Sequence, residues 1–107
     1  MKYEVVISEH AEQDLRAIYE YIAFEKQSPE TASNLLLRLE EQILKLDEMP
    51  QRFREYEEEP WKSRGLRVMP VENYMVCYIP RDEYERVYVI RVFYSGRNID
   101  KQLRKTQ

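Results

Sequence analysis

The stretch that decides the fold covers residues 66–103 and reads LRVMPVENYMVCYIPRDEYERVYVIRVFYSGRNIDKQL. Three runs rich in β-branched and aromatic residues predict strands over 65–71, 74–80 and 86–95. Only Glu72-Asn73 separates the first two runs, and a slightly longer loop over 81–85 precedes the third. Connections this short join antiparallel neighbours, so we expect these strands to form an antiparallel meander.

The first half of the chain predicts one further strand and two helices. Residues 2–7 alternate between two faces as a strand does, and Ser8 is a suitable cap for a helix that ends near Lys26. A second helix starts at Ser28-Pro29 and ends at about Met49, because Pro50 disfavours helical backbone before it. The apolar positions that recur at helical spacing are Ala11, Leu15, Ile18, Tyr19 and Ile22 in the first helix, and Ala32, Leu35, Leu36, Leu39, Ile43 and Leu46 in the second.

These elements predict an α+β fold in the order β-α-α-β-β-β. We expect an antiparallel-rich four-stranded sheet that includes the first strand and is covered on one face by a helical hairpin. The tail over 98–107 is expected to form a short helix with Ile99 and Leu103 as its apolar contacts. The chain of 107 residues is expected to be one domain over 1–107.

Composition narrows the class of protein further. No apolar run approaches the roughly 20 residues of a membrane helix, and the N-terminus becomes polar too early for a signal peptide. Cys77 is the only cysteine, so we expect neither an internal disulfide nor a multi-cysteine metal site. We therefore expect a cytoplasmic protein without a metal or cofactor, with Cys77 as a small buried side chain.

Charge is divided unevenly along the chain. Residues 1–51 hold 5 Lys and Arg against 11 Asp and Glu, whereas residues 52–107 hold 12 against 9. The acidic surplus therefore lies on the predicted helices and the basic surplus on the sheet. Two explanations remain open: the acids keep a helical face soluble, or the sheet side meets a polyanion.

The sequence resembles the RelE/ParE superfamily of toxins from bacterial toxin–antitoxin modules over nearly its whole length. The segments that carry the likeness are KYEVVIS, EHAEQDLRAIYEYIA, LDEMP, the LR of GLRVMPV, NYMVCYI and VYVIRVFYSGRNID. The resemblance implies a toxin that a cognate antitoxin neutralises. RelE-type members cut mRNA in the ribosomal A site, whereas ParE-type members inhibit DNA gyrase and are not nucleases.

Three residues are candidates for chemistry if the protein is a nuclease. Arg67 matches the family's arginine in the LR segment, and its planar fork suits two phosphate oxygens. The alternative for Arg67 is an internal pair with an acid. Tyr94 lies where many relatives place a catalytic residue, and it is a candidate base, a platform for stacking RNA bases, or a cap on the core. Arg91 lies beside it as a candidate third catalytic residue.

Strand alternation limits how these residues can meet. Val89 and Arg91 are predicted to share one face of the last strand, and Tyr94 lies on the other. Tyr94 can therefore join the arginines only if the strand bulges or turns near Ser95-Gly96. Arg97 follows this break and is free to reach back toward Tyr94.

The loop before the second predicted strand adds weaker candidates. Lys62 and Arg64 are predicted to bind RNA phosphate, with solvated side chains as the alternative. The acid run 57–59 offers a carboxylate base, although it would also repel RNA. His10 is the only histidine and starts the first helix, far from the other candidates, so the chain lacks a histidine acid or base there.

Three functions follow from these residues. The leading hypothesis is a ribosome-dependent mRNA endonuclease in which Arg67 stabilises phosphate charge, Tyr94 acts as base or platform, and Arg91 and Arg97 assist. The alternatives are a non-enzymatic inhibitor of DNA gyrase and an inactive module that binds an antitoxin. Each implies an antitoxin partner, expected to place an amphipathic helix in an apolar groove of the toxin.

Overall fold

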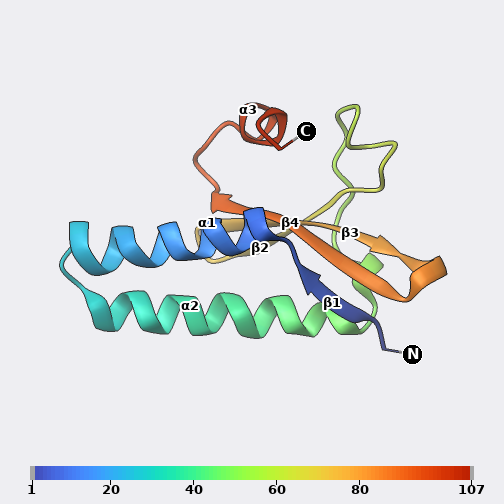
Figure 1. The fold of residues 1–107 in the computed structure, drawn as a ribbon. Coiled ribbons are helices and arrows are strands. Elements are labelled where there is room, and N and C mark those ends of the chain that lie inside the picture. Colours follow the sequence, from blue (N-terminus) through green and yellow to red (C-terminus); the bar gives the residue numbers. More distant parts are fainter. Residues whose placement is uncertain (1, 107) are drawn as a thin grey trace.

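The protein is described by a computed structural model that covers residues 2–106. Four strands and three α-helices follow one another as shown in Figure 1. In chain order they are β1 (Glu4–Ile7), α1 (Glu9–Glu20), α2 (Pro29–Leu44), β2 (Arg67–Val71), β3 (Tyr74–Arg81), β4 (Arg86–Tyr94) and α3 (Ile99–Arg104). Among these residues no helix is both long enough and apolar enough to cross a membrane.

The four strands form one mixed sheet in the order β1-β4-β3-β2. β2, β3 and β4 are an antiparallel meander, and β1 joins it as a parallel neighbour of β4. The tight turn at Glu72-Asn73 requires positive φ at Glu72, which is 53°. The predicted α+β fold, with the first strand added to the meander, is confirmed.

The helical hairpin of α1 and α2 covers one face of the sheet (Figure 1). Ser8 caps α1, because its Oγ accepts the N–H of Ala11 at 3.1 Å. The apolar stripes of both helices pack on alternate residues of the strands. Fully buried members of this core include Ala11, Leu39, Ile43, Leu46, Tyr78, Val87 and Val89.

The end of the first helix agrees with its predicted position, and the end of the second helix does not. α1 is followed by a π-helical segment, Tyr21–Glu25, which carries the helix to the predicted end near Lys26. α2 ends at Leu44 rather than at about Met49, and a 3₁₀ turn over Lys45–Asp47 follows. The residue before a proline disfavours helical backbone, and Met49 before Pro50 has a left-handed backbone conformation with φ of 47°.

The second face of the sheet is covered as well, by α3 and the loop over 53–66 (Figure 1). This smaller core contains Tyr56, Trp61, Leu66 and Leu103, packed on β-strand residues that include Cys77. The predicted tail helix is therefore confirmed, with Leu103 buried and Ile99 against the same cluster.

A β-bulge interrupts β4 at a position that strand alternation did not predict. Cys77 pairs with Arg91 whereas Tyr78 pairs with Val89, which leaves Ile90 without a partner on β3. Val89 consequently packs in the core under the helices, and Arg91 does not. The expectation that Val89 and Arg91 share a face was wrong, because one extra residue reverses the alternation. The bulge falls at Ile90 and not near Ser95-Gly96, where the chain instead turns after β4.

Candidate functional site

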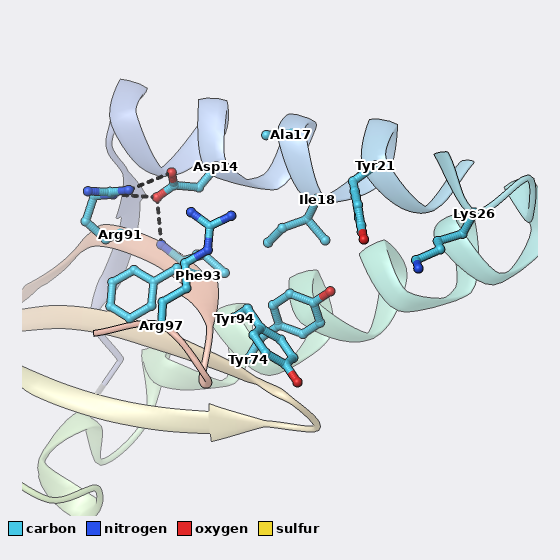
Figure 2. Close-up of a pocket in the computed structure, with 11 residues that line it drawn as sticks. Asp14, Ala17, Ile18, Tyr21, Lys26, Tyr74, Arg91, Phe93, Tyr94 and Arg97 are labelled. Atoms are coloured by element: carbon cyan, nitrogen blue, oxygen red, sulfur yellow. Dashed lines mark hydrogen bonds and ion pairs between the residues drawn. The ribbon is translucent and has the colours of Figure 1, made fainter. Parts of the chain in front are cut away.

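A cleft with a volume of about 650 Å³ lies between α1 and the adjoining ends of β3 and β4. Figure 2 shows side chains from the helix and from the sheet converging on it. The lining residues are Asp14, Ala17, Ile18, Tyr21, Lys26, Tyr74, Arg91, Val92, Phe93, Tyr94 and Arg97. The cleft thus brings three of the predicted site residues, Arg91, Tyr94 and Arg97, to one place.

Tyr94 forms the sheet side of this cleft together with Tyr74, its neighbour across the strands. Their rings meet edge to face, with centroids 5.9 Å apart and planes inclined by 75°. Burial raises the pKa of Tyr74, with the Tyr94 hydroxyl as a smaller cause in the same direction. Tyr94 itself is 50% exposed, so its ring can contact a ligand as well as its neighbour.

The turn after β4 sets the position of Tyr94. Ser95 N–H donates to Asn73 O at 2.8 Å, and Arg97 N–H donates to Tyr94 O at 3.0 Å. The ring of Tyr94 lies over Gly96, where an added Cβ would stand only 2.4 Å from the Tyr94 Cε2 atom. Glycine is therefore required for this ring position, and the same turn places Arg97 in the cleft with Tyr94.

Arg91 lines the cleft, but every nitrogen of its guanidinium group donates to an acceptor of the protein itself. Its Nε donates to Asp14 Oδ2 at 2.7 Å and its Nη2 to Asp14 Oδ1 at 3.1 Å (Figure 2). Its Nη1 donates to Gln102 O at 2.8 Å and to Thr106 Oγ1 at 3.0 Å. Asp14 in turn accepts the Val92 N–H at 2.9 Å. Arg91 therefore joins α1, β4 and α3.

Arg67 lies well away from Tyr94. Arg67 pairs with Tyr78 of β3, whereas Tyr94 pairs with Tyr74 of the same strand. Tyr78 and Tyr74 are four residues apart, which is about 13 Å along the strand. The Arg67 Nη1 donates to Gln51 O at 3.0 Å and to Phe53 O at 2.6 Å, and its Nη2 pairs with Glu55 at 3.2 Å. These contacts match the alternative of an internal partner and hold the segment that follows α2 against the sheet edge.

Lys62 and Arg64 form a separate exposed group on the loop before β2. The Arg64 guanidinium carbon lies 4.7 Å from the centroid of the Trp61 ring. Of the acid run, Glu59 accepts hydrogen bonds from Ser63 N–H at 3.0 Å and Ser63 Oγ at 2.8 Å. These bonds lower the pKa of Glu59, which makes its carboxylate a weaker base. Neither Lys62 nor Arg64 lines the cleft at Tyr94.

The sequence analysis predicted only Arg91, Tyr94 and Arg97 of the cleft residues, and the polar side chains that it missed include Asp14, Tyr21, Lys26 and Tyr74. The Lys26 Nζ lies 5.6 Å from the centroid of the Tyr21 ring, at the end of the first helix, and Tyr21 is 50% exposed. No local motif connects this helix end to a strand that starts 48 residues later. An exposed tyrosine beside a lysine at a helix end was the available signal, and nine tyrosines in the chain made it weak.

Comparison with solved structures shows that other small α+β proteins share this fold. The chain of the chromosomal ParDE toxin–antitoxin system from P. aeruginosa is similar with a TM-score of 0.69 and 21% identity, over 87% of this chain and 96% of that one. A chain of the toxin–antitoxin complex RelBE2 from Mycobacterium tuberculosis is similar with a TM-score of 0.68 and 20% identity, over 88% of this chain and 92% of that one. A mutant of the E. coli toxin RelE in the free state is similar with a TM-score of 0.66 and 17% identity, over 99% of this chain and 94% of that one.

A family model identifies the family to which the chain belongs. The model described as the ParE toxin of the type II toxin–antitoxin system, parDE, matches residues 5–99. The chain therefore belongs to the ParE toxin family, within the RelE/ParE superfamily, and is a toxin of a type II toxin–antitoxin system. No curated protein matches it by sequence.

Proposed function

We propose that this toxin acts by binding its target, DNA gyrase, and not by cleaving RNA. The observation that supports the proposal is the state of the two strand arginines. The guanidinium groups of Arg67 and Arg91 both donate to acceptors of the protein itself, and Arg91 is only 6% exposed. Cleavage of RNA without a metal needs positive charge that faces the phosphate, and an arginine whose guanidinium group already binds internal acceptors supplies less of it.

The groups available for proton transfer favour the same conclusion. His10 is on α1 and does not line the cleft that contains Tyr94. The Glu59 carboxylate is engaged by Ser63, which lowers its pKa and its basicity. A general base works best with a pKa near the working pH, and neither residue supplies one beside Tyr94. Binding without catalysis needs no such group.

We further propose that a cognate antitoxin is the resident partner of this toxin in the cytoplasm. The chain belongs to a family of toxins from type II toxin–antitoxin systems. One of the similar solved structures is a toxin–antitoxin complex. A small reading frame next to the gene is the candidate for this partner. The protein that this reading frame encodes should form a stable complex with the toxin. It should also relieve the inhibition of gyrase by the toxin.

Two assays with the purified toxin test the proposed target. In the first, gyrase supercoils relaxed plasmid with and without the toxin; in the second, a defined mRNA is translated in a cell-free reaction and its ends are mapped. We expect blocked supercoiling and intact message, with supercoiling restored by the product of the adjoining frame. New mRNA ends that depend on translating ribosomes, with unimpeded supercoiling, would overturn the proposal.

A ribosome-dependent mRNA endonuclease is the second candidate, and one observation favours it. Tyr94 is half exposed and shares its cleft with Arg97, so an aromatic platform and a cation face the same space. In that function Tyr94 stacks a base or removes the 2′-hydroxyl proton, Arg97 and the loop residues Lys62 and Arg64 bind phosphate, and Arg67 and Arg91 leave their present partners. Tyr94→Phe separates the two roles of Tyr94, because phenylalanine stacks but removes no proton.

A further inference from the structure

The side of α2 that faces away from the sheet exposes two leucines to solvent. Leu37 is 57% exposed and Leu44 is 60% exposed, and neither belongs to the two buried cores. They lie seven residues apart, which is about two helical turns, so both point to the same side of the helix. The buried residues of α2, which include Leu39 and Ile43, lie on a different side. The two leucines therefore form an apolar stripe on α2, which runs along one edge of the molecule (Figure 1).

Glutamates flank these leucines along the helix. Glu40 and Glu41 lie three and four residues after Leu37, which places one on each side of the line that joins Leu37 to Leu44. Glu30 lies two turns before Leu37 on the same side of α2. All three glutamates are exposed, and within residues 2–106 none of them forms an ion pair. We call this set, Glu30, Leu37, Glu40, Glu41 and Leu44, the acidic leucine stripe.

The charge of the acidic leucine stripe limits what can cover it. Arg38 is the only basic residue of α2, and it pairs with Glu72 of the β2–β3 turn at 2.8 Å. A second copy of the chain packed through the same face would bring the glutamates of both copies together, and like charges at an interface oppose association. A membrane with anionic lipids would repel the stripe for the same reason. The partner that fits is a protein surface with Lys or Arg side chains around apolar groups.

We infer that the acidic leucine stripe is the face through which the toxin docks on a basic, partly apolar surface of DNA gyrase. This inference rests on the proposed function and names the toxin surface that it uses. Gyrase must bind DNA in order to supercoil it, and protein surfaces that bind DNA carry an excess of Lys and Arg. The cleft at Tyr94 matches such a surface less well, because Lys26 and Arg97 line it without an ion-pair partner among residues 2–106.

The test measures binding of the full-length toxin to the gyrase holoenzyme by titration calorimetry at low and high salt, together with inhibition of supercoiling. Leu37→Gln/Leu44→Gln should bind about 10-fold or more weakly, and glutamine keeps the helix propensity of leucine. Glu40→Lys/Glu41→Lys should also bind about 10-fold or more weakly at low salt, with a smaller difference at high salt. Positive charge near the end of α2 suits the helix dipole, so this variant should stay folded.

Two matched controls change similar groups on the loop between β3 and β4. Tyr84→Gln removes an exposed ring, and Glu83→Lys/Glu85→Lys reverses two exposed charges. Both controls should bind gyrase and block supercoiling like the unmodified toxin. Circular dichroism confirms that each variant is folded, and size-exclusion chromatography reports whether the unmodified toxin forms dimers.

The outcomes separate this inference from the proposed function. If the unmodified toxin blocks gyrase and both folded α2 variants bind and block it equally well, the inference is overturned and the proposed function stands. If the unmodified toxin neither binds nor blocks gyrase, the proposed function is overturned and the inference with it. Dimers of the unmodified toxin that Leu37→Gln/Leu44→Gln dissolves, with gyrase binding retained, would assign the stripe to a second copy of the chain and would also overturn the inference.

Discussion

Replacing Arg91 with leucine should destabilise the protein strongly, because this arginine is the only cation that pairs with Asp14 among the described residues. The Arg91 side chain is 7% exposed and that of Asp14 is 14% exposed, so little water screens the ion pair at 2.7 Å. Arg91→Leu leaves the Asp14 carboxylate with only the Val92 N–H as a partner. It also removes both donors to the end of α3, at Gln102 O and Thr106 Oγ1.

The magnitude follows from the burial of the pair. Removing one partner of a buried ion pair costs about 3–5 kcal/mol, because the other charge remains without compensation. A domain of this size has a free energy of unfolding of about 5–15 kcal/mol. With a urea dependence of about 2 kcal/mol per molar, in the middle of the usual range, the unfolding midpoint should fall by roughly 1.5–2.5 M.

Urea unfolding followed by two signals measures this loss. Circular dichroism reports the helices, and the fluorescence of Trp61, the single tryptophan, reports the small core that includes Leu103 of α3. We expect the Trp61 signal of Arg91→Leu to change at a lower urea concentration than the dichroism. The reason is that α3 loses its attachment to β4 while the helical hairpin keeps its own core.

A double variant identifies the cause of the loss. Asp14→Asn/Arg91→Leu removes both charges and keeps an amide oxygen that can accept the Val92 N–H. It should recover a large part of the stability lost in Arg91→Leu, because no buried charge is then left unpaired. A loss below about 1 kcal/mol in Arg91→Leu, or no recovery in the double variant, would refute this account of Arg91.

Three further changes test other parts of the structure. Arg67→Ala should cost about 1–3 kcal/mol and speed amide exchange over residues 50–56, because Phe53 O loses its donor; unchanged exchange there would contradict this role. Burial raises the pKa of Tyr78 from 10.0 to about 12, so its contribution to stability is complete below pH 10 and is lost as the pH rises through 12. The unfolding free energies of the protein and of Tyr78→Phe should therefore converge over that range, and a constant difference would be the contrary result. Burial also raises the pKa of the Cys77 thiol to about 12, so it should resist a disulfide reagent at pH 8 until urea unfolds the chain; rapid modification of the folded protein would count against this burial.

Most of the fold could be predicted from the sequence, because each element carries a strong local signal. The runs around Val68, Val76 and Val89 have strand character, Ser8 caps a helix, and Glu72-Asn73 permits only a tight turn. The bulge at Ile90 could not be predicted, since the apolar run through β4 fits either alternation. Packing against the two cores of the sheet decides between them, and it puts Val89 and Arg91 in different surroundings.

The candidate site was predicted only in part. Tyr94 and Arg97 share a cleft, as the break at Ser95-Gly96 suggested, because both lie on one short turn. Arg67 lies apart from them, since the antiparallel register places it at the opposite end of β2. The register is a property of the paired strands, and no single strand reveals it. The helix residues of the cleft were missed because no local motif connects the end of this helix to β3.

The parallel pairing of β1 with β4 has a consequence for how the chain is made. β1 pairs with β4, which is the last of the four strands to be synthesised. Asp14 of α1 likewise binds Arg91 and Val92, which are translated much later than Asp14 itself. Contacts between such distant residues form slowly, and a chain still under synthesis lacks β4 altogether. An incomplete chain therefore has neither the sheet nor the cleft. The four-stranded sheet and the cleft at its edge can therefore form only after β4 has been translated.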